Sequence, residues 1–297
     1  MFDVVVVGGG PAGLSAALML GRCRRRVLVC DARQPRNAAS HALHGYLTRD
    51  GVAPAALNAL GRAELGKYDV QLREGVVTGV QREADLFRVS LADGRVEHAR
   101  FILIATGVVD ELPEVRGLSE CYGRSVFHCP YCDGWERRDR RLGALGQGRS
   151  GMQLALSLKT WSSKVVLLAH GSRLGGAALA RLARNGVEVV PDRLLSLVHE
   201  DGQLSAVQCE GGRTVELDAV FFTSGQHQHC DLAEGLGCVF NRKGTVETGM
   251  RSETNVPNVF VAGDASRDAQ FVVVAAAEGV KAALAIDQAM QQQELLP

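Results

Sequence analysis

The stretch FDVVVVGGGPAGLSAALMLGRCRRRVLVCD, residues 2–31, decides the fold. Residues 3–7 contain an apolar, β-branched run, which is typical of a strand buried on both faces. The glycine-rich GGGPAG at residues 8–13 breaks this run, and residues 14–20 continue as an apolar helix. Residues 27–30 then form a second apolar strand, which ends at Asp31. Strand, glycine turn, helix, strand and acid occur in the order that a dinucleotide-binding unit requires.

Each glycine of this G-x-G-x-x-G pattern has a separate mechanical role. Gly8 allows a tight turn, Gly10 lets the backbone approach a pyrophosphate at the helix N-terminus, and Gly13 lets helix and strand pack closely. Asp31, at the end of the second strand, is placed to accept hydrogen bonds from a ribose. We therefore predict a dinucleotide site that contains Gly8, Gly10, Ala12, Gly13 and Asp31.

A second copy of the unit occupies residues 142–168. It reads as strand, glycine loop, apolar helix and strand, with the loop glycines at Gly146, Gly148 and Gly151. The acid expected after its second strand is missing, because residues 170–173 read HGSR. The copy therefore either binds a pyridine nucleotide through these glycines or has kept its shape and lost its ligand.

Two further strand-like segments, residues 101–107 and 256–264, each end in a small-residue turn. The second segment places Asp264 at the carboxyl end of its strand, the edge where ligands bind in open α/β sheets. We predict an α/β protein with two Rossmann-like, three-layer dinucleotide-binding domains, the second inserted into the first. The discontinuous first domain comprises residues 1–116 plus 242–297, and the inserted domain comprises residues 117–241.

The bulk composition excludes several classes of function. The 297 residues carry 33 Lys and Arg against 33 Asp and Glu, so no whole-molecule field attracts nucleic acid or an anionic membrane. The apolar N-terminus lacks the basic region of a signal peptide, and no run reaches the roughly 18 apolar residues that span a bilayer. Eight cysteines are too sparse for a disulfide scaffold, which favours a reducing compartment. We predict a cytoplasmic protein that contacts neither nucleic acid nor membrane.

The segment HCPYCDGWE, residues 128–136, places Cys129 and Cys132 three positions apart. A structural zinc site would need four ligands, and the chain has no second Cys-x-x-Cys pair. A permanent disulfide across so short a loop would contribute little chain entropy. A redox pair explains the motif better, because Cys-x-x-Cys geometry lowers a thiol pKa and the thiolate attacks disulfides. We predict no metal site, and catalytic roles for Cys129, Cys132 and Asp133, the last as the group that holds or delivers a proton.

Taken together, these motifs resemble the low-molecular-weight thioredoxin reductases over essentially the whole chain. The shared features are both glycine loops, the ATG at residues 105–107, the C-x-x-C-D-G at residues 129–134 and the Gly-Asp at residues 263–264. The resemblance implies an FAD in the discontinuous domain, a homodimer, and a thioredoxin-like protein or small dithiol as partner. It also implies that Cys132 faces the flavin and that Cys129 forms the mixed disulfide with the substrate.

The same resemblance extends the expected FAD site beyond the first glycine loop. It assigns the ribityl chain to Asp264, which follows Gly263. The remaining positions that it places in the flavin pocket are Asn37, Thr106, Gly107, Gln270 and Phe271.

Several stretches look closer to a thioredoxin-reductase-like subgroup, namely HGYLTRDG at residues 44–51, the CPYC motif and residues 221–229. This subgroup includes flavoenzymes with unusual electron donors and dithiol oxidases, and its members usually place His where this chain has Asp133. The NADPH-using members carry an Arg pair that clamps the 2′-phosphate, but Gly171 and Ser172 stand there in this chain. Arg149 also occupies the second glycine loop. The pattern leaves both NADPH and NADH open as the nucleotide.

The leading hypothesis is therefore an FAD-dependent thiol-disulfide oxidoreductase that reduces thioredoxin or a similar dithiol protein. One alternative is a dithiol oxidase that passes electrons to oxygen. A second is a reductase supplied by ferredoxin or another flavoprotein. A third, non-enzymatic alternative is a flavin redox sensor.

Overall fold

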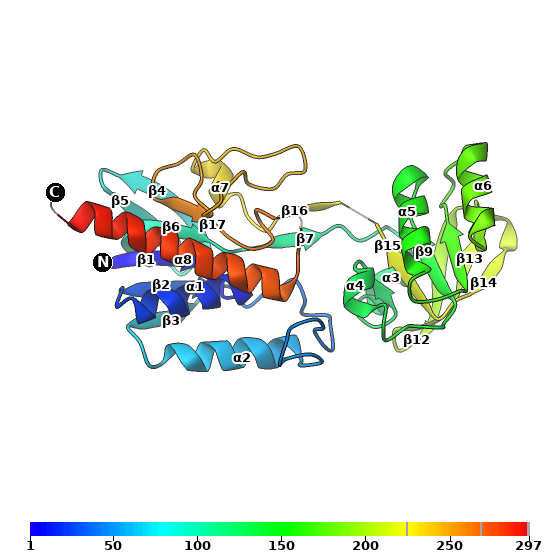
Figure 1. The fold of residues 1–297 in the computed structure, drawn as a ribbon, viewed down its shortest axis with the longest axis horizontal. Helices are drawn as coiled ribbons and strands as arrows, with labels where there is room; N and C mark the ends of the chain where they lie inside the picture. Colours follow the sequence, from blue (N-terminus) through cyan, green and yellow to red (C-terminus); the bar gives the residue numbers. More distant parts are fainter. Residues whose placement is uncertain (224, 268, 296–297) are drawn as a thin grey trace. The chain divides into compact units, whose positions relative to one another are not determined.

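The computed structural model describes residues 1–223, 225–267 and 269–295. The described chain divides into two compact α/β units (Figure 1). Unit 1 contains Met1–Ala38, Tyr46–Val109 and the chain from Gln226 onward, and unit 2 contains Ala39–Gly45 and Asp110–Gly225. The segment Ala39–Gly45 packs with unit 2, although the chain on both sides of it belongs to unit 1. This packing was not predicted from the sequence, because all of residues 1–116 were assigned to the first domain.

The centre of unit 1 is a mainly parallel sheet in the order β3-β2-β1-β6-β5-β4, with β17 pairing to β6. The strands β1, β2, β3, β6 and β17 run parallel, whereas β4 and β5 form an antiparallel extension. The first unit predicted from the sequence is thus present as β1, α1 and β2. The strand bounds are β1 (Phe2–Val7), β2 (Val27–Asp31), β3 (Val70–Glu74), β4 (Val77–Glu83), β5 (Leu86–Leu91), β6 (Val96–Ile104) and β17 (Val259–Val261).

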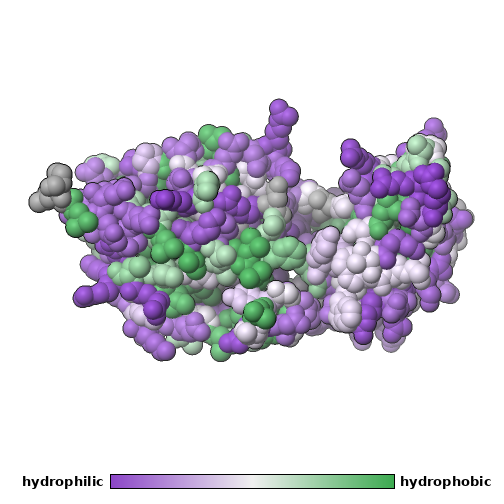
Figure 2. All heavy atoms as spheres, in the orientation of Figure 1, coloured by the Kyte–Doolittle hydropathy of each residue, from purple (hydrophilic) through white to green (hydrophobic). Residues whose placement is uncertain are grey.

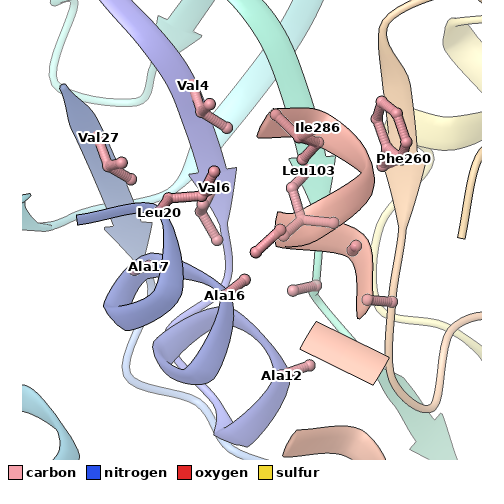
Figure 3. Close-up of a cluster of buried hydrophobic side chains, with 14 of the residues drawn as sticks. Val4, Val6, Ala12, Ala16, Ala17, Leu20, Val27, Leu103, Phe260 and Ile286 are labelled. Carbon is pink, nitrogen blue, oxygen red and sulfur yellow. The ribbon is translucent and has the colours of Figure 1, made fainter. Parts of the chain in front are cut away.

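Helices α1 (Pro11–Arg22) and α8 (Val272–Glu294) pack against each other beside this sheet (Figure 3). A Cβ added to Gly279 of α8 would lie 2.0 Å from the carbonyl oxygen of Ala12, so only glycine permits this approach. The buried core between helices and sheet includes Val6, Leu103 and Ile286. This packing fixes the start of α1 at the carboxyl edge of the sheet. The remaining helices of unit 1 are α2 (Pro54–Leu65) and α7 (Leu232–Gly235).

Unit 2 repeats the parallel plan in the order β11-β10-β9-β15-β8. An antiparallel sheet, β12-β13-β14, accompanies it. Outside these sheets, β7 (Val108–Asp110) pairs with β16 (Gln226–Gln228) in a ribbon whose residues, apart from Asp110, belong to unit 1. The second strand-helix-strand unit predicted from the sequence is therefore present as β9, α5 and β10. The strands of unit 2 are β8 (Val126–Phe127), β9 (Leu142–Leu145), β10 (Val165–Leu168), β11 (Val187–Val190), β12 (Leu194–Glu200), β13 (Gln203–Cys209), β14 (Thr214–Glu216) and β15 (Ala219–Phe222). The helices are α3 (Leu118–Cys121), α4 (Pro130–Asp133), α5 (Gly148–Leu158), α6 (Gly176–Arg184) and the 3₁₀ turn η1 (Glu210–Gly212).

Polar and charged residues cover much of the visible face of each unit (Figure 2). Within the described ranges, no helix is both long enough and apolar enough to cross a membrane.

Candidate active site

The first glycine loop joins β1 to α1 at the carboxyl edge of the unit 1 sheet. Gly8 has φ +110°, and a Cβ there would lie 2.3 Å from the carbonyl oxygen of Ala105. A Cβ on Gly13 would lie 1.9 Å from the carbonyl oxygen of Gly8. Gly10 differs, because its φ is −80° and no atom lies within 4 Å of the place that a Cβ would take. The loop is therefore tightly packed on its inner side and open at Gly10, at the N-terminus of a helix, where anions are stabilised.

Asp31 ends β2 beside this loop. Burial opposes its ionisation, but bonds from Arg62 and from the Arg33 amide lower the pKa of Asp31 below its usual value. Arg62, from α2, forms an ion pair with Asp31, while its Nε is buried without a hydrogen-bond partner in the described part of the chain. The position thus combines an ionised acceptor with an unused donor, a pair of groups that suits a ribose or phosphate oxygen. Sequence reasoning missed Arg62, because nothing in the motif points to a helix so far along the chain.

A second polar cluster lies in the same unit, where β17 ends. Asp264 Oδ2 lies 2.9 Å from Arg36 Nη1, and the same nitrogen donates to Gln270 Oε1 at 2.6 Å. Arg36 is followed directly by Asn37, and Gln270 by Phe271, the N-cap of α8. The structure therefore brings together two predicted residues, Asp264 and Gln270, through an arginine that the sequence motifs did not reveal.

Thr106 and Gly107 complete the predicted set in unit 1, directly after β6. Gly107 has φ +71° and Gly263 has φ +81°, so both turns need glycine geometry. Because β1, β6 and β17 are parallel neighbours, their carboxyl ends place Gly8, Thr106 and Gly263 on one edge of the sheet.

The second glycine loop keeps the close approach between its first and last glycines, but its middle differs. Gly148 has φ +51° and begins α5, whereas Gly10 has φ −80° and is the N-cap of α1. A Cβ on Gly151 would lie 2.1 Å from the carbonyl oxygen of Gly146, whereas the space at Gly148 is open. Beside the loop is a pocket of about 530 Å³ in unit 2. Its lining includes Gly146, Gln147, Ser150, His170 and Thr223, together with Glu111, Leu112, Pro113, Leu145 and Gly225.

His170 stands two residues beyond the end of β10, next to the position that corresponds to Asp31 in the first unit. Its Nδ1 accepts a hydrogen bond from the Leu194 amide at 3.1 Å, which assigns the proton of the neutral ring to Nε2. Burial and the nearby Arg193 charge lower the pKa of His170, so the imidazole is neutral at pH 7. The lining of this pocket therefore includes a histidine with a ring N–H donor, one residue past the position that matches Asp31 in unit 1.

The Cys-x-x-Cys motif follows β8 and opens the short helix α4. Cys129 and Cys132 form a disulfide with their Cα atoms 5.3 Å apart. Cys129 is the N-cap of α4, Pro130 occupies the first turn, and the Cys132 amide donates to the Cys129 Sγ at 3.2 Å. After reduction, the same amide would stabilise a thiolate on Cys129, the residue expected to attack the substrate.

Asp133 directly follows the second cysteine and has an unusual environment. Burial, followed by the Glu136 charge, raises the pKa of Asp133 to about 6, while His44 and Arg137 act in the opposite direction. A carboxyl group with this pKa is populated in both protonation states near neutral pH, which general acid-base chemistry requires. Sequence reasoning proposed this role for Asp133 but assigned none to His44.

Asp133→Asn should stabilise the fold at pH 8. Because the folded pKa of about 6 lies above the ordinary value of 3.8, the stability contributed by Asp133 is present below pH 4 and lost as pH rises through 6. We expect the variant to gain about 1–3 kcal/mol in free energy of unfolding at pH 8, after allowing for partial solvent screening, and little at pH 4. Urea unfolding at both pH values measures this, and equal effects at both would contradict the raised pKa.

Exposed aromatic side chains lie near the disulfide. Tyr131 is 71% exposed and Trp135 is 64% exposed. The Tyr131 ring packs edge-on against Trp161 at 5.4 Å, and the Arg138 guanidinium lies 4.3 Å from the centre of the Trp135 ring. Tyr131 and Trp135 are therefore exposed aromatic side chains next to the motif, and each packs against one neighbouring side chain.

The remaining cysteines lack these features. They are free, and burial raises the thiol pKa of several, in the case of Cys30 to about 11. Within the described ranges, no group of three His, Cys, Asp or Glu side chains could hold a metal ion.

Comparisons with known proteins agree with this architecture. Residues 2–279 match the family model of the pyridine nucleotide-disulphide oxidoreductases. A probable thioredoxin reductase of Arthroderma benhamiae is 31% identical, over 90% of this chain and 74% of that protein. Among solved structures, the putative thioredoxin reductase TrxB from Bacillus anthracis is 30% identical, with a TM-score of 0.95 over 99% of this chain and all of that one. HlmI is 37% identical, with a TM-score of 0.95 over 99% of this chain and 93% of that one.

These likenesses confirm the predicted fold class, two dinucleotide-binding domains of the Rossmann type, and the predicted kind of enzyme. The family also implies a flavin and a nicotinamide cofactor. The chain therefore belongs to the pyridine nucleotide-disulphide oxidoreductases and is a thioredoxin-reductase-like flavoprotein oxidoreductase.

Proposed function

We propose that this protein is an FAD-dependent disulfide reductase that transfers electrons from NADPH, through Cys129 and Cys132, to thioredoxin or a similar dithiol protein. The observation that carries the proposal is the Cys129–Cys132 disulfide, followed directly by a carboxyl group whose pKa is about 6. A nucleophile and a proton donor matched to neutral pH are the two protein groups that thiol-disulfide exchange requires.

The residues of unit 1 fit an FAD. The open position at Gly10 admits a pyrophosphate, and Asp31 with the unpartnered Arg62 Nε suits the adenosine ribose. Arg36 and Asp264 would face the polyol and ring end of the cofactor. When bound, the FAD supplies a two-electron store between nucleotide and disulfide.

The unit 2 pocket supports a pyridine nucleotide, and its polar groups favour NADPH. Gly146, Gly148 and Gly151 keep a phosphate cradle, while His170 presents an N–H donor with Arg193 close by. A 2′-phosphate accepts from donors, whereas the 2′-hydroxyl of NADH is usually bound by a carboxylate. In this assignment, His170 and Arg193 bind the 2′-phosphate in place of the missing Arg pair.

The protein groups of the exchange step act in a fixed order. The Cys129 thiolate attacks one sulfur of the substrate disulfide, and the departing sulfur takes its proton from Asp133. Asp133 then takes the proton of the Cys132 thiol, and the Cys132 thiolate attacks the Cys129 sulfur. This restores the Cys129–Cys132 disulfide and releases the second substrate sulfur, which takes that proton from Asp133. The chain dithiol loses two electrons and the substrate disulfide gains two, so the step is balanced.

The relatives named thioredoxin reductase suggest thioredoxin as the partner. The exposed Tyr131 and Trp135 near the disulfide support a docking partner of protein size. We further propose that the enzyme is a homodimer, which light scattering of the purified protein would test.

Anaerobic titration of the purified protein tests the electron donor. We expect up to two equivalents of NADPH to bleach the flavin band near ~450 nm, because the disulfide and the flavin each take two electrons. NADH should do so about tenfold or more less efficiently, because only NADPH carries the phosphate that His170 would bind. A His170→Ala variant should lose most of this preference. If neither nucleotide bleaches the flavin but a dithiol does, electrons flow from substrate thiols as in an oxidase. Bleaching by reduced ferredoxin alone would identify a ferredoxin-linked reductase.

A further inference from the structure

The segment Ala39–Gly45 is held on unit 2 by close packing. Gly123 has φ +75°, and a Cβ there would lie 2.3 Å from the carbonyl oxygen of Ala39, so the two backbones are in direct contact. Leu43 of the same segment is only 6% exposed. The backbone contact at Ala39 and the buried side chain of Leu43 thus hold the segment in place. His44 directly follows Leu43.

His44 lies in the charged cluster that follows the Cys-x-x-Cys motif. Its Nε2 is 3.5 Å from Glu136 Oε1, and the side chains are 23% and 38% exposed, respectively. Glu136 is three residues after Asp133, and Arg137 is the next charged group along the chain. The imidazole therefore comes from a distant part of the sequence to meet a carboxylate that belongs to the motif.

The charges around Asp133 act in opposite directions. After burial, the largest influence is Glu136, whose negative charge favours the protonated form of Asp133. His44 and Arg137 favour the ionised form. Because His44 is in contact with Glu136, it can offset the charge of this carboxylate at its source. The Arg137 guanidinium instead lies over the Phe127 ring.

We propose that His44 is a positioning residue of the thiol-disulfide exchange, which holds Glu136, offsets its charge and thereby sets the pH at which Asp133 gives and regains its proton. The proposal rests on the proposed function of Asp133 as the proton donor. Without His44, the uncompensated charge of Glu136 would favour the protonated form of Asp133, and Asp133 would exchange its proton at higher pH.

Carbon NMR of the flavin-loaded protein, labelled at the aspartate carboxyl carbons, tests this proposal without turnover. The Asp133 signal is assigned as the one missing in Asp133→Asn. We expect its midpoint to rise by about half a unit in His44→Gln and to fall by a similar amount in Glu136→Gln. His41→Gln is the matched control, because His41 is an exposed histidine of the same segment, and it should leave the midpoint unchanged.

The pH profile of disulfide reduction gives the second readout. In His44→Gln the limb assigned to Asp133 should move in the same direction as the NMR midpoint, and Glu136→Gln should move it the opposite way. A general loss of folding would lower all rates without opposite shifts. An unchanged midpoint in His44→Gln, or shifts of the same sign in both variants, would overturn the proposal. If the unaltered protein reduces no disulfide, the proposed function fails, while the NMR titration still decides whether His44 acts on Asp133.

Discussion

Serine in place of Cys132 is expected to lower disulfide turnover by about 10³-fold or more, because a serine hydroxyl provides no thiolate at neutral pH. The variant should still attack a substrate disulfide through Cys129. The Sγ of Cys129 still accepts a hydrogen bond from the backbone amide of residue 132, which the substitution does not remove. It cannot then resolve the mixed disulfide. We therefore expect a covalent complex with an oxidised thioredoxin that is seen by mass spectrometry and is released by dithiothreitol.

The companion variants distinguish this mechanism from a general loss of activity. Cys129→Ser should lose turnover to the same extent but form no covalent complex, since the attacking thiol is gone. Cys23→Ser is the control, because Cys23 is a free cysteine whose thiol pKa is raised, first of all by burial. It should keep turnover within about twofold, the ordinary effect of a substitution away from the site. In all three variants NADPH should still reduce the flavin, and substantial disulfide turnover by Cys132→Ser would refute the proposed function.

The parts of the site that follow from local patterns could be predicted from the sequence. A strand buried on both faces, followed by glycines and an acid, specifies β1, the turn at Gly8 and Asp31 through backbone geometry alone. The same holds for the strand ends at Thr106 and Gly263, because parallel strands bring their carboxyl ends to one edge. These positions depend on contacts between neighbouring elements of a repeated unit, and such contacts leave a regular signal in the sequence.

The partners of these residues could not be predicted, because they come from segments without a repeated pattern. Arg62 reaches Asp31 only after α2 has packed, and Arg36 meets Asp264 through the fold of a turn. His170 illustrates the same limit. The sequence shows that an acid is missing there, but the protonated nitrogen is fixed by the Leu194 amide at the start of β12. His44 lies outside every motif with an assigned role, and only its packing on unit 2 brings it to Glu136.

Gly10→Val should yield a folded protein that lacks its flavin. The backbone at Gly10 has φ −80° and ψ −174°, which any residue adopts, and a Cβ there would meet no protein atom within 4 Å. The added side chain would instead fill the space in which a pyrophosphate approaches the start of α1. Loss of those charge-assisted bonds, each worth roughly 1.5–3 kcal/mol, should weaken FAD binding by about 100-fold. Absorbance of the purified variant and its titration with added FAD measure this.

Two other glycines serve as controls for the effects of valine itself. Gly175, the N-cap of α6, also has an extended backbone and open space, so Gly175→Val should cost about 1 kcal/mol for the lost glycine cap and keep its flavin. Gly13→Val should destabilise the fold by about 3 kcal/mol or more, because its Cβ would overlap the carbonyl oxygen of Gly8. The three variants should therefore differ in kind. Gly10→Val should lose its flavin but keep its fold, Gly13→Val should lose both, and Gly175→Val should keep both. Normal flavin content in Gly10→Val would show that the pyrophosphate does not lie at this turn, and the assignment of the FAD to unit 1 would have to be abandoned.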